Sequence, residues 1–100
     1  MDKIINWLKE DKIDFEERYI SGNTIFMTVG VYGESYEVEI TVENMGVYME
    51  VIEISFRFFE AMNTIVDIID TFQKHYNGKY HIIYGVGLGD IEKIITLERM

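Results

Sequence analysis

The sequence predicts one α+β domain, 1–100, in which a single antiparallel sheet packs with an N-terminal helix and one central helix. First, 100 residues with 48% hydrophobic content suit one domain with one core. Second, apolar and polar residues alternate in several segments before residue 59, and the turns between them are too short for parallel crossovers. Third, an apolar stripe at helical spacing follows residue 60.

The first half of the chain predicts a short helix and a four-strand meander. Residues 1–11 carry Ile4, Ile5 and Leu8 at helical spacing. Alternation then predicts strands at 13–20, 24–32, 35–43 and 47–58, which Gly- and Asn-containing turns separate. The 35–43 segment alternates most cleanly. Its apolar residues are expected to face inward and its acids outward: Tyr36, Val38, Ile40 and Val42 against Glu37, Glu39 and Glu43.

The second half predicts the central helix and a closing hairpin. The helix is expected to start near Asn63 or Thr64, with Thr64 and Asp67 as a capping box, and to stop at Asn77-Gly78. A strand at 79–86 follows. The last segment, 91–99, is predicted as the second strand of the hairpin, and a helix capped by Asp90 is the alternative. The helix stripe is Met62, Ile65, Ile69, Phe72 and Tyr76.

The acidic charge is concentrated in the middle of the chain. Residues 34–70 contain nine of the 18 acidic residues and a single base, Arg57. Phosphate binding requires clustered Lys and Arg, so direct binding to nucleic acid or to an anionic membrane is not expected. A basic protein surface is the partner that this charge fits.

No catalytic, cofactor or metal site is predicted. The glycines at 85, 87 and 89 lack the strand-loop-helix context and the lysine of phosphate-binding loops. His75 and His81 do not converge with Asp67 and Asp70 at helical spacing, and the absence of cysteine excludes thiol chemistry. We therefore expect a non-enzymatic protein without a cofactor. With neither disulfides nor a signal-peptide pattern, it is expected in the cytoplasm.

The sharper hypothesis for the acids is a spaced array of carboxylates that imitates a phosphate backbone. The simpler interpretation is an acidic surface that only provides solubility. In a regular strand Glu50 and Glu53 point to opposite faces, so both join one array only if a bulge or strand end intervenes. The expected partner-binding residues are Glu34, Glu37, Glu39, Glu43, Glu50, Glu53, Asp67 and Asp70, and more than half of the acids from 34 to 70 should share one exposed surface.

Aromatic residues near the junction of the fourth strand and the central helix exceed what one small core needs. Tyr48, Phe56 and Phe58 are therefore candidates for a contact with a second copy or another partner. A well-filled core is the alternative explanation.

Size, acidity and a bias toward isoleucine, with 16 Ile, one Ala and no Pro, suggest an AT-rich genome. In these general features the chain resembles small inhibitors of phages and mobile elements, including anti-CRISPR and anti-restriction proteins. That resemblance implies a protein that blocks a nucleic-acid-binding surface. The alternative is a dimeric secretion-chaperone-like or adaptor domain whose acidity only provides solubility.

Overall fold

The structure is a computed structural model that describes residues 2–44, 50–75, 80–86 and 93–99, without the side chains of residues 44, 50, 80–86 and 99. Its elements follow in chain order: α1 (Asp2–Glu10), β1 (Phe15–Ser21), β2 (Thr24–Val31), β3 (Glu34–Asn44), β4 (Glu50–Phe56), the 3₁₀ turn η1 (Phe59–Ala61), α2 (Met62–His75), β5 (Tyr80–Val86) and β6 (Lys93–Arg99).

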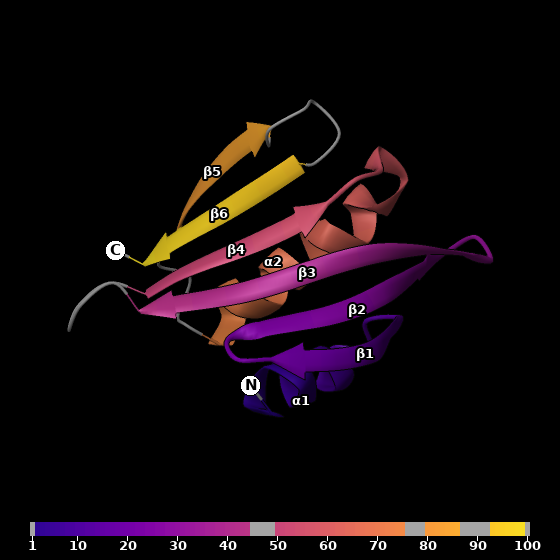
Figure 1. Ribbon diagram of the computed structural model, residues 1–100, viewed down its shortest axis with the longest axis horizontal. Coiled ribbons are helices and arrows are strands. Elements are labelled where there is room, and N and C mark those ends of the chain that lie inside the picture. The colour runs from indigo at the N-terminus through magenta and orange to yellow at the C-terminus, as the bar shows by residue number, and fades with distance from the viewer. Residues whose placement is uncertain (1, 45–49, 76–79, 87–92, 100) are drawn as a thin grey trace.

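All six strands form one antiparallel sheet in the order β1-β2-β3-β4-β6-β5. Both helices lie behind one face of this sheet, and no helix of the described residues covers the other face, which we call the open side (Figure 1). The predicted α+β class, with a meander, a closing hairpin and two helices, is confirmed. The segment 91–99, where a helix was the alternative, contributes strand β6.

The core lies between the sheet and the two helices. Helix α1 contributes Ile4, Ile5 and Leu8, the three residues whose spacing predicts its buried face. Alternate residues of the strands complete the core because successive side chains of a strand point to opposite faces. The remaining members include Ile25, Met27, Val38, Ile40, Ile52, Ile54, Phe56, Ile65, Ile68, Phe72, Ile95 and Leu97.

Of the element boundaries that differ from the prediction, two lie at the junction of β4 and α2. Helix α2 begins at Met62 after η1, so Thr64 lies inside the helix and does not cap it. Strand β4 ends at Phe56, two residues earlier than predicted, because the chain turns into η1 at Phe59. The predicted stop at Asn77-Gly78 lies outside the described residues.

The β2–β3 turn contains a strained tyrosine. Tyr32 has φ +51° and Gly33 has φ +84°, as a two-residue type I′ hairpin requires, and the Tyr32 side chain is 98% exposed. A left-handed conformation costs an ordinary residue about 1–2 kcal/mol, and Asn adopts it more readily. We expect Tyr32→Asn to raise the free energy of unfolding by up to about 1 kcal/mol, measured by urea denaturation. Tyr32→Phe should be neutral, and a loss of stability in both variants would contradict this assignment of strain.

Candidate functional site: the acidic face of the sheet

The open side of the sheet carries carboxylates from four strands. Strand pairing identifies them, because residues directly opposite one another point to the same face. Glu37, Glu39 and Glu43 alternate with the buried Val38 and Ile40 on β3. We call the full set the acidic face: Glu16 (β1), Glu37, Glu39 and Glu43 (β3), Glu53 (β4) and Glu98 (β6).

The acids of this face are separated by neutral neighbours. Glu37 lies opposite Thr28, and Glu39 lies between Phe26 and Ser55 on the flanking strands. Glu53 lies between Thr41 and Thr96, while Glu43 and Glu98 both lie opposite Val51. Glu37 and Glu39 are about 7 Å apart by strand geometry, Glu39 and Glu43 are about 13 Å apart with Thr41 between them, and neighbouring strands are about 4.8 Å apart. The carboxylates are therefore spaced across the sheet and are not stacked directly against one another.

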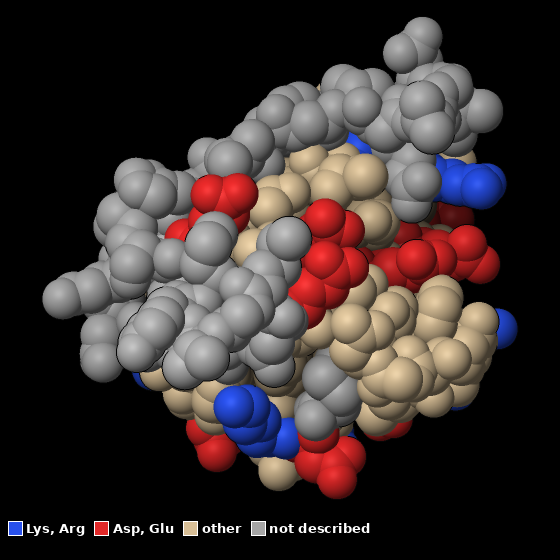
Figure 2. All heavy atoms as spheres, turned by 60° about the vertical axis from the view of Figure 1, so that its left-hand side comes forward, with Lys and Arg blue, Asp and Glu red and all other residues tan. Residues whose placement is uncertain are grey.

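Figure 2 shows this side obliquely, with carboxylates in red among neutral side chains. Four of the six acids are exposed, and Glu53 and Glu98 are half-buried. An array of like charges in one layer raises the electrostatic free energy of the folded chain, and an oppositely charged partner lowers it. The geometry therefore suits a broad cationic surface better than a small ligand.

The structure places the predicted partner-binding acids on different sides of the sheet. Glu37, Glu39, Glu43 and Glu53 share the acidic face, whereas Asp67 and Asp70 lie on α2, on the other side of the sheet. Glu34 and Glu60 are exposed outside the acidic face, at the β2–β3 turn and in η1. The expectation that helix acids join the strand acids is wrong. Of the eight acids between 34 and 70 whose side chains the structure describes, four share the acidic face, which is half of them. The side chain of the ninth, Glu50, lies outside the described residues.

Sequence reasoning missed Glu98 as a member of the array. Its place depends on β6 inserting between β4 and β5, which brings Glu98 opposite Val51. No local pattern shows which strand a C-terminal hairpin will pair with. Glu16 was missed as well, although the alternation within its own strand places it on this face.

The aromatic candidates for a partner contact also separate. Phe56 is 2% exposed and belongs to the core, so its assignment to a dimer contact is wrong. Phe58 is 55% exposed and its ring lies 5.7 Å from that of Tyr36. Tyr48 lies outside the described residues. The two rings are only two positions apart, but Phe56 is the last inward-facing residue of β4 and Phe58 follows the strand.

A second polar region lies where the end of α1 meets α2. A hollow of about 490 Å³ is lined by the acids Asp11, Asp14, Asp67 and Asp70 together with Lys12 and Lys74. Asp11 is already engaged there, because it accepts hydrogen bonds from Thr71 Oγ1 at 2.7 Å and from Lys74 Nζ at 2.8 Å. These bonds connect residues 60 or more positions apart and tie the α1–β1 loop to α2. We assign this cluster to folding.

The Asp11 cluster predicts a specific pH dependence. The hydrogen bond from Lys74, and then that from Thr71, holds the pKa of Asp11 below its ordinary value of 3.8. A lowered folded-state pKa stabilises the fold above the ordinary pKa, and this stabilisation is lost as pH falls through the folded-state value. Asp11→Asn should therefore lower stability at pH 7, and its difference from wild type should close below about pH 4.

The measurement is urea denaturation at a series of pH values. Asp70→Asn, which removes the same charge from an exposed position lining the same hollow, is the control and should not reproduce that pH profile. A constant difference between wild type and Asp11→Asn across the acid range would contradict the assignment.

Within the described residues, no group of three or more His, Asp and Glu side chains is placed to hold a metal ion. The His75 ring stacks on Trp7 with centroids 4.4 Å apart, and its Nε2 is buried without a hydrogen-bond partner in the described structure. His81 belongs to β5, where side chains are outside the description.

Comparison with protein-family models, curated proteins and solved structures finds no match. The described part of the chain contains no helix that is long and apolar enough to cross a membrane.

Proposed function

We propose that the chain is a non-catalytic binding protein whose acidic face docks onto a basic, nucleic-acid-binding surface of another protein and excludes the nucleic acid. The spacing of carboxylates across four strands is the observation that supports this proposal. The inhibitors of phages and mobile elements, anti-CRISPR and anti-restriction proteins among them, are the functional class that this mode of action fits. Catalysis, a cofactor, a membrane and direct nucleic-acid contact form no part of it.

Two physical arguments favour docking over solubility alone. Solubility requires net charge, which any distribution of 18 acids against nine bases would provide. Concentrating six carboxylates on the face that the helices leave open adds local repulsion without adding solubility. A cationic partner would relieve this repulsion, and its association would be fast and strongly dependent on salt.

The test uses the immobilised chain and the proteins of a bacterial lysate that heparin retains, which enriches nucleic-acid-binding proteins. We expect the chain to retain a defined protein from this fraction and a duplex DNA oligonucleotide to displace it. Purification of that protein then allows the competition to be measured directly. Retention that duplex DNA leaves unchanged would contradict the proposal.

The exposed aromatic end of the sheet supports a second candidate function, a dimeric adaptor. Phe58 and Phe59 are 55% and 60% exposed, and Lys93 Nζ lies 4.5 Å from the centre of the Phe59 ring. Burial of these rings between two copies would remove apolar surface from water. The mass in solution, measured by sedimentation at high protein concentration, discriminates this candidate from a monomeric inhibitor.

A further inference from the structure

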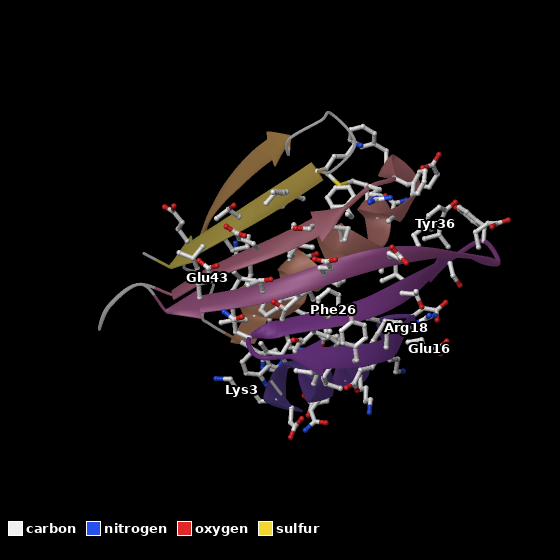
Figure 3. The ribbon with its side chains drawn as sticks, viewed as in Figure 1. Lys3, Glu16, Arg18, Phe26, Tyr36 and Glu43 are labelled. Atoms are coloured by element: carbon white, nitrogen blue, oxygen red, sulfur yellow. The ribbon has the colours of Figure 1, made fainter. Side chains whose placement is uncertain are left out.

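One part of the acidic face is concave and contains aromatic rings. A groove of about 190 Å³ runs between β1 and β3 and is lined on the open side by Arg18, Tyr19, Phe26, Thr28, Glu37 and Glu39. The rings of Tyr19 and Phe26 stack with centroids 4.3 Å apart and planes inclined by 16°. Figure 3 shows Phe26 and Arg18 on this part of the sheet, with Glu43 toward the opposite end of β3.

Strand pairing sets the aromatic rings beside the acids. Tyr19 lies opposite Phe26, and Phe26 lies opposite Glu39, so the three form one row across the sheet. Glu37 is the next open-side residue along β3, about 7 Å away by strand geometry. A bulge between Glu17 and Tyr19 places Arg18 outside the regular register and at the groove.

This combination fits a guanidinium better than an ammonium. Arginine stacks its planar group on an aromatic face and donates paired hydrogen bonds to a carboxylate. Lysine is a more strongly hydrated point charge that gains less from a ring. In this groove the pair of rings lies in the same row as Glu39 and beside Glu37. The groove therefore discriminates arginine from lysine, although the two side chains carry the same charge.

We infer that this groove binds an arginine side chain of the basic partner, so that the acidic face prefers arginine-rich over lysine-rich surfaces. The inference rests on the proposed function, since it takes the occupant to be part of a cationic protein. Arg18 lines the groove as well, so a cation of this chain already shares the groove that the incoming guanidinium enters to stack on Phe26.

The experiment compares decaarginine with decalysine, which carry the same charge, by fluorescence anisotropy of labelled peptides at fixed ionic strength. We expect wild type to bind decaarginine at least fivefold more tightly. Phe26→Leu, which keeps an apolar side chain but removes the ring, should reduce this ratio toward one without weakening decalysine binding. Phe59→Leu, at an exposed aromatic outside the groove, is the matched control and should leave the ratio unchanged.

Proton NMR provides an independent readout of stacking. The δ-methylene protons of an arginine dipeptide should shift upfield in the presence of wild type, and not in the presence of Phe26→Leu, because a ring current acts only at short range. Equal ratios in wild type and Phe26→Leu would overturn the inference. If only the Arg18→Ala variant preferred decaarginine over decalysine, the inference would also be overturned, because the Arg18 side chain would then occupy the groove in wild type.

These outcomes are separable from failure of the proposed function. Displacement of the captured protein by duplex DNA tests whether the acidic face competes with nucleic acid. The peptide ratio tests only which cation the groove accepts. An arginine preference without DNA competition would refute the inhibitor and retain the arginine site.

Discussion

Replacing Glu37, Glu39, Glu43 and Glu53 together by Gln is expected to weaken binding to the captured partner by about 1–3 kcal/mol, or roughly 5- to 160-fold. Each exposed carboxylate alone contributes about 0–1 kcal/mol, so Glu37→Gln should be nearly silent. All four side chains lie on the acidic face, where Gln preserves shape while removing charge. Isothermal titration calorimetry at two salt concentrations measures the effect.

The chain offers a control with the same change in net charge. Glu34→Gln, Glu60→Gln, Asp67→Asn and Asp70→Asn replace four exposed acids outside the acidic face. The two variants together replace eight acids, and the sequence predicts all of them except Glu60 as partner-binding residues. The structure separates these acids into two groups. We expect the control variant to bind as wild type does. Equal weakening by both variants would show that net charge matters and that its placement does not.

Salt provides a second comparison. Raising the ionic strength from ~0.1 to ~0.5 M shortens the screening length well below the width of the acidic face. Binding by wild type and by the control variant should weaken strongly, while binding by the acidic-face variant should change little. If the acidic-face variant binds the partner as tightly as wild type does at low salt, the charge serves only solubility. That result would favour the adaptor function.

The sequence predicts the architecture well where a local pattern sets it. Alternation on β3 places Glu37, Glu39 and Glu43 correctly, because one buried face fixes the register of the whole strand. The helical spacing of Ile4, Ile5 and Leu8 identifies the buried face of α1 for the same reason.

What the sequence could not provide depends on contacts between distant segments. Glu98 joins the acidic face only because β6 pairs with β4. The bond from Thr71 to Asp11 joins residues 60 positions apart. The groove between β1 and β3 requires the bulge at Arg18, which brings Tyr19 opposite Phe26. In each case no short pattern specifies the pairing, so the site became visible only in three dimensions.

The aromatic pair at the end of β4 gives the largest predicted effect on stability. Phe56 is 2% exposed within the core, so Phe56→Ala removes a fully packed ring and is expected to lower the free energy of unfolding by about 3–5 kcal/mol. Phe58 is 55% exposed and its ring lies 5.7 Å from that of Tyr36, so Phe58→Ala should cost less than about 1.5 kcal/mol.

Urea denaturation at two protein concentrations measures both effects and separates a core role from a role in a dimer. Stability that derives from a dimer contact depends on protein concentration, whereas stability that derives from the core does not. If Phe56→Ala does not fold, Phe56→Leu keeps most of the volume and should show a smaller loss in the same direction. The contrary result is that Phe58→Ala lowers the free energy of unfolding as much as Phe56→Ala does, and by less at the lower protein concentration. That result would place the aromatic end of the sheet in an interface. Our expectation is the reverse, since the ring of Phe56 packs against residues of its own chain.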